Sequence, residues 1–212
     1  MDKIIQQALD FAKEFFAGEA SGHDYFHTYR VYKNAEMLVN DLPEVDKEIC
    51  LLGAILHDVD DEKISPETHR DKDNARKFLN GVNYPQEKIK FLCKIIGDVS
   101  FSEGVKPESL EGKIVQDADR LDAIGAIGIA RTFAYGGNKG REIYNPDIKP
   151  ELNQTKEQYK MSKPPTINHF YEKLLLLEGL MNTEIAKQYA RKRTEFMEDY
   201  LEEFFAEWNG ER

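Results

Sequence analysis

Apolar residues recur along most of the chain with the spacing of a helix rather than that of a strand. Over residues 4–16 they follow the i, i+3, i+4 rule of an amphipathic helix. The same pattern predicts further helices over residues 24–40, 46–56, 72–79, 85–99, 109–124, 167–181 and 183–208. No sustained alternation of apolar and polar residues, which would mark a half-buried strand, interrupts this series. We therefore expect an all-α fold.

The helical pattern weakens in the second half of the chain. Residues 125–131 continue the preceding helix with small side chains that suit close helix packing, and residues 101–107 resemble a loop. From residue 135 to 165, glycines and prolines interrupt the pattern repeatedly, apart from a short helix expected within 151–159. A stretch this long without regular structure is usually functional or mobile, so we predict a lid over residues 135–165. We expect residues 1–212 to form a single domain, with a C-terminal helical extension from about residue 166.

Charge and composition narrow the range of partners. The formal net charge is −10, so the chain is a poor general binder of nucleic acid, whose affinity comes from neutralised phosphates. A small phosphorylated substrate remains compatible, because it needs only a local cationic pocket or a metal. No apolar run is long enough to span a membrane, and the N-terminus lacks the apolar core of a signal peptide, so we expect a cytoplasmic protein that binds no membrane. Cys50 and Cys93 lie in apolar stretches and are expected to be buried thiols without a disulfide.

Four positions carry the candidate chemistry: His27, the adjacent pair His57 and Asp58, and Asp119. The pair follows a strongly apolar helix, and burying ionisable groups without a partner is costly. A divalent cation would satisfy two imidazoles and two carboxylates together. This donor set suits Mn, Fe, Co, Ni or Zn better than Ca. Spacing alone also permits a structural role, in which His57 and Asp58 cap a helix and Asp119 pairs with an arginine.

Four segments, in order along the chain, resemble the HD-domain superfamily of metal-dependent phosphohydrolases, and in particular its small bacterial members. They are residues 22–31 (GHDYFHTYRV), 54–61 (AILHDVDD), 117–131 (DADRLDAIGAIGIAR) and 169–173 (HFYEK). The resemblance implies an HD-domain-like helical bundle and assigns the metal ligands to His27, His57, Asp58 and Asp119. His23, four residues before His27, competes for the role of ligand.

The number of metal ions follows from the same resemblance. Many two-metal relatives have two further histidines between the His-Asp pair and the last aspartate, whereas this chain has only His69 there. We therefore expect one divalent ion, of an identity that the sequence leaves open among Mn, Ni, Co, Fe, Mg and Zn. A carboxylate such as Asp61 or Glu62 could help to hold a second ion.

A base and several cations complete the expected site. Asp61 is the candidate base or water-orienting group, because related phosphohydrolases carry a carboxylate at the matching place, and Glu62 is the second choice. The alternative is that residues 60–62 form a solvated acidic turn. Candidate substrate contacts are His23, Lys63, Arg120, Asp122, Lys163, His169 and Lys173. Asp122 could instead orient Asp119, and Arg120 could instead pair with Asp117 or Glu111.

These features predict a metal-dependent phosphohydrolase acting on nucleotides or related phosphate esters. The subgroup resemblance points to nucleoside triphosphates, cleaved to a monophosphate and pyrophosphate. The alternatives are a ligand-sensing HD-domain module and an iron-dependent oxygenase on the same scaffold. The sequence leaves open whether the last helix packs in the core or against a second subunit as a homodimer. Its aromatic residues are Phe196, Tyr200, Phe204, Phe205 and Trp208.

Overall fold

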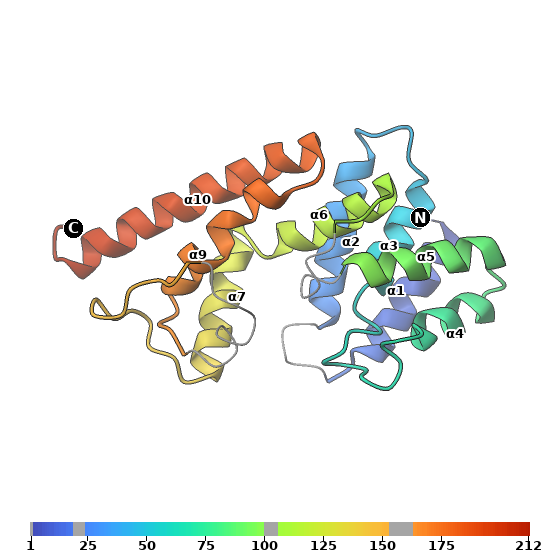
Figure 1. Cartoon of the computed structure of the whole chain (residues 1–212), viewed down its shortest axis with the longest axis horizontal. Coiled ribbons are helices and arrows are strands. Elements are labelled where there is room, and N and C mark those ends of the chain that lie inside the picture. Colours follow the sequence, from blue (N-terminus) through green and yellow to red (C-terminus); the bar gives the residue numbers. More distant parts are fainter. Residues whose placement is uncertain (1, 19–23, 100–105, 153–162) are drawn as a thin grey trace. The chain divides into compact units, whose positions relative to one another are not determined.

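The computed structural model describes residues 2–18, 24–99, 106–152 and 163–212 (Figure 1). Within these ranges the regular structure is helical throughout, without a strand, which confirms the all-α fold class. The chain divides into two compact units, Met1–Asp119 and Arg120–Arg212. The expectation of a single domain over residues 1–212 stays a prediction.

The unit Met1–Asp119 is a bundle around one buried helix. Its helices are α1 (Lys3–Phe15), α2 (Tyr25–Val39), α3 (Lys47–Leu56), α4 (Asp73–Gly81), α5 (Gln86–Val99) and most of α6 (Leu110–Asp122). Helix α3 packs against α1, α2 and α5, and seven of its ten residues are buried. A β-carbon on Gly53 would lie 2.9 Å from Val115 Cγ2, so the absence of a side chain lets α3 and α6 approach closely. The central position of α3 places its C-terminal residues, His57 and Asp58, next to the core.

The unit Arg120–Arg212 is built on two packed helices and several shorter turns. It contains α7 (Gly125–Asn138), α9 (Asn168–Glu172), the 3₁₀ turns η2 (Leu174–Leu176) and η3 (Glu178–Leu180), and α10 (Glu184–Trp208), which packs on α7. The aromatic residues of α10 divide between two environments. Phe204 and Phe205 pack against Tyr144, and Tyr200 packs against Phe133 and Phe170, whereas Phe196 is about half exposed.

The helix expected over residues 109–124 ends earlier, and a separate helix follows it. Helix α6 stops at Asp122, and Gly125 begins α7 with a φ of +76°, a conformation that disfavours a side chain. A β-carbon there would also lie 3.1 Å from Arg193 Cβ. Helix α7 then extends to Asn138, so residues 135–138, expected to be irregular, are helical.

The prediction of one continuous helix over residues 167–181 is wrong. Helix α9 ends at Glu172 because Lys173 has φ −143° and ψ −57°, outside the helical region. The 3₁₀ turns η2 and η3 follow. An apolar run such as Leu174–Leu177 fits either structure, which is why periodicity alone does not detect the break.

The predicted lid is only partly described. The loop after α7 is tied back by Thr166 and Ile167, whose N–H groups donate to the carbonyls of Glu142 and Ile143 at 2.8 and 3.0 Å. Most of the short helix expected within 151–159, and the loop expected at 101–105, lie outside the described residues. The role of residues 135–165 as a lid stays a prediction.

Both cysteines are buried free thiols, as expected. Cys50 is 0% exposed and Cys93 is 6% exposed, and burial raises the pKa of each thiol. Among the described helices, none has the length and apolarity needed to cross a membrane.

Candidate metal centre

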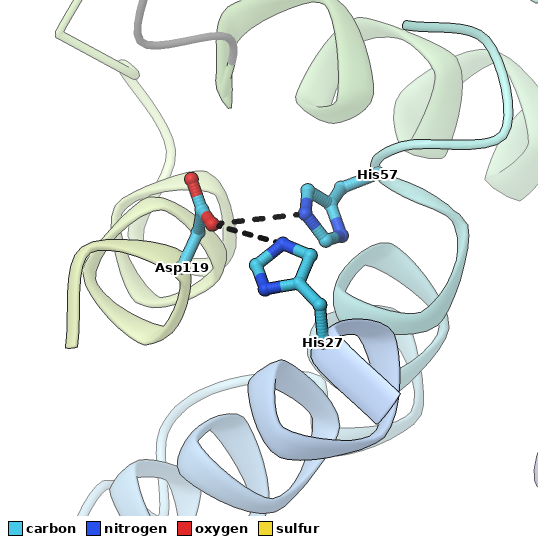
Figure 2. A group of neighbouring side chains, drawn as sticks. All are labelled: His27, His57 and Asp119. Atoms are coloured by element: carbon cyan, nitrogen blue, oxygen red, sulfur yellow. Dashed lines mark ion pairs between the residues drawn. The ribbon is translucent and has the colours of Figure 1, made fainter. Parts of the chain in front are cut away.

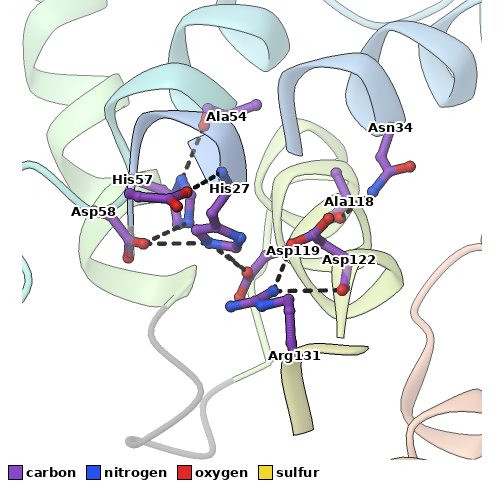
Figure 3. A network of polar contacts seen from close by, with 10 residues as sticks. His27, Asn34, Ala54, His57, Asp58, Ala118, Asp119, Asp122 and Arg131 are labelled. Atoms are coloured by element: carbon purple, nitrogen blue, oxygen red, sulfur yellow. Dashed lines mark hydrogen bonds and ion pairs between the residues drawn. The ribbon is translucent and has the colours of Figure 1, made fainter. Parts of the chain in front are cut away.

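Helix α2 supplies His27 from its first turn. Asp24 is the N-cap, and its carboxylate accepts a hydrogen bond from the His27 N–H at 2.7 Å. His27 is 2% exposed. About two turns beyond, Asn34 donates its side-chain amide to the Ala118 carbonyl at 3.0 Å, which ties α2 to α6 (Figure 3). The cap and this bond together hold His27 facing the helix that carries Asp119.

His57 follows the last residue of α3 and has a defined ring orientation. Its Nδ1 lies 2.9 Å from the Ala54 carbonyl, which can only accept, so Nδ1 carries the proton of the neutral ring (Figure 3). The lone pair of the neutral ring is therefore on Nε2, the atom that faces the other site residues. Fixing the tautomer through the second ring nitrogen is typical of histidines that bind metals.

The four predicted ligands converge. His27, His57 and Asp119 each offer one ligand atom, and these atoms all lie within 4.8 Å of one another (Figure 2). Asp119 Oδ1 is 3.5 Å from Nε2 of His27 and 3.8 Å from Nε2 of His57. Asp58 Oδ2 is 3.3 Å from both Nε2 atoms. All four residues belong to the unit Met1–Asp119.

The electrostatics of this cluster favour a cation. Burial opposes protonation of His57, yet the carboxylates of Asp58 and Asp119 outweigh it and raise the pKa of His57 to about 10. Nε2 of His57 is buried and, within the described residues, meets no hydrogen-bond partner of acceptable geometry. A buried polar atom without such a partner is costly. A divalent ion bound by two imidazole nitrogens and two carboxylates would satisfy it, so the residues present fit a metal.

The acidic turn after Asp58 divides into a buried and an accessible part. Asp60 is 1% exposed, so the alternative of a fully solvated turn over residues 60–62 is wrong at this position. Its carboxylate accepts N–H bonds from the first turn of α4 instead. Asp61 is partly exposed and Glu62 is exposed. Asp61 Oδ1 accepts the Lys63 N–H at 2.9 Å.

His69, the additional histidine between the His-Asp pair and Asp119, has a structural contact. Its Nδ1 lies 2.9 Å from the Asp60 carbonyl. It does not belong to the group formed by His27, His57 and Asp119, the only such group among the described residues. The expectation of a single ion stays a prediction.

Two predicted substrate contacts on α6 have structural partners in the unit Arg120–Arg212. Asp122 is 2% exposed, and its carboxylate accepts a hydrogen bond from the Arg131 guanidinium (Figure 3). Arg120 donates to the Leu180 carbonyl, and its expected pairing with Asp117 or Glu111 stays a prediction. Their roles as substrate contacts remain predictions. The alternative is that these contacts within the protein are their main role.

The remaining candidate contacts lie on several segments. Lys63 and Lys163 are exposed. His169 and Lys173 are one turn apart, since the Lys173 N–H donates to the His169 carbonyl at 3.0 Å. Burial and the nearby charges of Lys173 and Arg141 lower the pKa of His169 to about 3, so its ring is neutral and would bind a phosphate as a hydrogen-bond donor rather than as a charge. His23 lies outside the described residues.

Sequence reasoning did not identify two residues that organise this region, Arg131 and Asn74. Arg131 neutralises Asp122, nine residues earlier. Asn74 bonds three groups of the segment after Asp58. Neither contact follows from periodicity, although Arg131 lies within one of the segments that carry the family resemblance.

The comparisons with known proteins agree with this site. The HD domain family model matches residues 24–124, a span that includes all four candidate ligands. A protein of known structure from Lactobacillus plantarum is 40% identical, with a TM-score of 0.82 over 99% of both chains. An HD-superfamily hydrolase from Bacillus thuringiensis is 41% identical, with a TM-score of 0.78 over 97% of this chain and 96% of that chain.

A further relative was crystallised with a nucleotide. Bacillus subtilis YpgQ is 32% identical over 203 residues, which are 94% of this chain and 91% of YpgQ. The structure of YpgQ in complex with ADP has a TM-score of 0.72 and 30% identity over 95% of this chain and 93% of that chain. Taken with the family match and the relatives above, these similarities establish that the chain belongs to the HD-domain superfamily.

Proposed function

We propose that this protein is a metal-dependent phosphohydrolase that acts on nucleotides or related phosphate esters with one divalent cation. The observation that carries the proposal is Nε2 of His57, a buried nitrogen aimed at two carboxylates with no hydrogen bond of its own among the described residues. The side chains around it favour positive charge so strongly that the pKa of His57 is raised to about 10. A metal ion supplies that charge and leaves the imidazole neutral.

The ligands are His27, His57, Asp58 and Asp119. Two features prepare them for binding: the bond from His57 Nδ1 to Ala54 fixes one ring, and the Asp24 cap fixes the first turn of α2. A bound divalent cation would polarise a phosphate oxygen and offset the charge that develops during hydrolysis. The mixed nitrogen and oxygen set suits Mn, Fe, Co, Ni or Zn, with Mg as the harder alternative.

Asp61 is the candidate base. It lies three residues beyond Asp58 and is partly exposed, as a group that takes a proton from an attacking water needs to be. Its Oδ1 accepts the Lys63 N–H, which fixes the carboxylate and leaves Oδ2 for the water. Glu62, exposed next to it, is the alternative base. Lys63, Lys163, Lys173 and neutral His169 are the candidate contacts to substrate phosphates.

The nucleotide in the proposal draws support from YpgQ, which was crystallised with ADP and resembles this chain over almost its whole length. We propose the finer reaction, cleavage of a nucleoside triphosphate to a monophosphate and pyrophosphate, on the subgroup resemblance of residues 22–31 and 54–61. A di-iron oxygenase would need a second set of ligands, and the described residues contain one group of metal-binding geometry.

Metal add-back to stripped protein tests the proposal. Ribo- and deoxynucleoside mono-, di- and triphosphates and a generic phosphate ester would be incubated with Mn²⁺, Ni²⁺, Co²⁺, Mg²⁺ or Zn²⁺, and released phosphate and pyrophosphate measured separately. We expect metal-dependent turnover that falls at least about a thousandfold in His57→Ala, because losing a ligand removes the cation from the site. Asp10→Asn, an exposed aspartate on α1, is the matched control.

The outcomes separate the competing functions. Pyrophosphate as the product supports the finer reaction, whereas inorganic phosphate alone rules it out and leaves cleavage of a terminal phosphate or of a phosphate ester. Tight nucleotide binding by the metal-loaded protein without any turnover would overturn the hydrolase in favour of a sensing module. Bound iron that reacts with oxygen, again without hydrolysis, would point to an oxygenase.

A further inference from the structure

The segment that joins α3 to α4 carries both Asp58 and Asp61, yet it contains no regular helix of its own. A segment of this kind depends on its hydrogen bonds to neighbouring elements for a fixed path. In this case the bonds to α4 are concentrated in two side chains. One is Asp60, on the segment, and the other is Asn74, in the first turn of α4.

Asp60 reaches from the segment to the helix. Its Oδ1 accepts the Asn74 N–H at 3.1 Å, and its Oδ2 accepts the Ala75 N–H at 3.0 Å. These are N–H groups of the first helical turn, which have no partner within the helix. The Asp60 side chain is buried, so these bonds are shielded from water. The helix therefore holds the Asp60 carboxylate firmly.

Asn74 reaches back from the helix to the segment. Its side-chain amide donates to the Val59 carbonyl at 2.9 Å, to Thr68 Oγ1 at 2.9 Å and to Ser65 Oγ at 3.3 Å. Asn74 thus bonds the segment at Val59, just before Asp60, and again at Ser65 and Thr68. We refer to the reciprocal pair of Asp60 and Asn74 as the clamp.

A tight turn links the two carboxylates on either side of Val59 and Asp60. The Asp61 N–H donates to the Asp58 carbonyl at 3.0 Å, a single turn with an i, i+3 bond. Residues three apart in such a turn lie on the same side. Val59 and Asp60, which are buried, occupy the other side, toward the core and α4. The turn therefore puts Asp61 on the same side as Asp58, while the clamp bonds residues between them to α4.

We propose that Asp60 and Asn74 are positioning residues that set the candidate base Asp61 relative to the metal centre. The inference rests on the proposed function and adds a role for two residues that do not touch metal or substrate. Asp58 follows the C-cap residue of α3, His57, and is held by that helix as well. Asp61 is bonded within its own turn to Asp58 and Ser65, and the clamp joins this turn to α4. Loss of the clamp should therefore slow turnover while metal binding persists.

Four variants test the role. Asn74→Ala and Asp60→Asn each break one arm of the clamp, and the double variant breaks both. Asn80→Ala is the matched control, since it removes a side-chain bond from the other end of the same helix, where Asn80 Oδ1 accepts from Gln86 at 2.7 Å. The measurements are kcat and KM of the metal-loaded enzyme, Mn²⁺ affinity by electron paramagnetic resonance, and amide hydrogen exchange over residues 61–65.

We expect kcat to fall by about tenfold or more in each single variant, a part of the 10²–10⁴-fold that a positioned base contributes. The double variant should be little slower than the worse single variant, because both residues act through one clamp. KM and the Kd for Mn²⁺ should change little. Hydrogen exchange over residues 61–65 should rise in all three clamp variants and stay at the wild-type level in Asn80→Ala.

Two results would overturn the role of the clamp. Faster exchange with an unchanged kcat would mean that the position of the segment does not limit turnover. A parallel loss of kcat and Mn²⁺ affinity would mean that the clamp supports the metal ligands rather than Asp61. Absence of hydrolysis by the wild-type protein overturns the proposed function itself, whereas normal wild-type turnover with an unaffected Asn74→Ala overturns only the clamp.

Discussion

Helix α6 carries two aspartates one turn apart that belong to different units and have different partners. Asp119, in Met1–Asp119, lies among imidazoles with a quarter of its side chain exposed. Asp122, in Arg120–Arg212, is buried and paired with Arg131. The first carboxylate faces two imidazole nitrogens, a set of donors suited to an added ion. The second has a cation supplied by the chain, Arg131, which favours a structural role.

The same contrast extends to the rest of each unit. In Met1–Asp119, buried polar side chains of α2, α3 and α6 converge on one point. In Arg120–Arg212, buried or half-buried cations are bound to backbone carbonyls, as Arg120 is to Leu180 and Arg193 is to Leu121. Residue type alone therefore does not separate a functional group from a structural one. The partner that the fold provides makes the distinction.

Substituting each aspartate of α6 by asparagine should separate function from stability. Asp119→Asn should lower turnover by at least about a thousandfold with little change in unfolding free energy, because it weakens a metal ligand. Asp122→Asn should lower the unfolding free energy by about 2 kcal/mol, less than the 3–5 kcal/mol of a fully buried pair because Arg131 is partly exposed. Turnover assays and urea denaturation measure the two effects. A stable Asp122→Asn with a raised KM would show instead that Asp122 contacts substrate.

A pH series should distinguish the two units through their histidines. The folded pKa of His169 is about 3 against 6.5 for a free imidazole, so the unfolded chain binds a proton that the folded protein does not. Neutral His169 therefore contributes fully to the unfolding free energy above pH 6.5, and the contribution is lost as the pH falls toward 3. The loss reaches about 2 kcal/mol of unfolding free energy at pH 5. The contribution of His57 to the unfolding free energy of the metal-free protein changes with pH in the opposite direction. Its protonation stabilises the folded protein, and this stabilisation is lost as the pH rises toward 10.

Urea denaturation between pH 7 and pH 5 measures the His169 contribution. His169→Gln should flatten this part of the stability curve, because the glutamine does not titrate. The exposed acidic side chains that also titrate in this range are common to both proteins, so the difference between the curves isolates His169. If His169→Gln lost as much unfolding free energy between pH 7 and pH 5 as the wild type, the imidazole of the folded wild type would be protonated in this range.

The smallest expected effects come from the helix caps of the two units. Asp24 caps α2 through the His27 N–H, and Thr183 caps α10 through the Ala186 N–H. Asp24→Ala and Thr183→Ala should each cost about 1 kcal/mol of unfolding free energy. Only Asp24→Ala should also weaken metal affinity, because its partner is the backbone of a ligand. Equal metal affinities for both variants would show that the rest of α2 holds His27 without the cap.

Much of the helical framework follows from the sequence because its signals are local. Asp24, Asp46 and Thr183 are N-caps that can be identified from the residues alone, and α2, α3 and α10 begin directly after them. The end of α6 and the break after α9 were not predicted. They depend on the backbone at Gly125 and Lys173, which a continuous apolar pattern does not reveal.

The grouping of the candidate metal ligands was predictable for a different reason. Spacing left the four ligands open to a structural interpretation, and the family resemblance selected His27, His57, Asp58 and Asp119, which the fold brings together. The clamp was not predictable in this way. Asp60 and Asn74 are fourteen residues apart, and only the path of the segment between them makes them partners. In the sequence, Asp60 is indistinguishable from the accessible carboxylates that follow it.

The buried thiols make the wild-type chain suitable for spectroscopic labelling. Because Cys50 and Cys93 are buried and their pKa values are raised, neither supplies a thiolate for maleimide or thiosulfonate reagents at neutral pH. New cysteines at exposed Asp10 and Glu202, one on each unit, would therefore be labelled alone. A pair of spin labels at these positions would report the distance between the units, with and without nucleotide, in an otherwise unmodified protein.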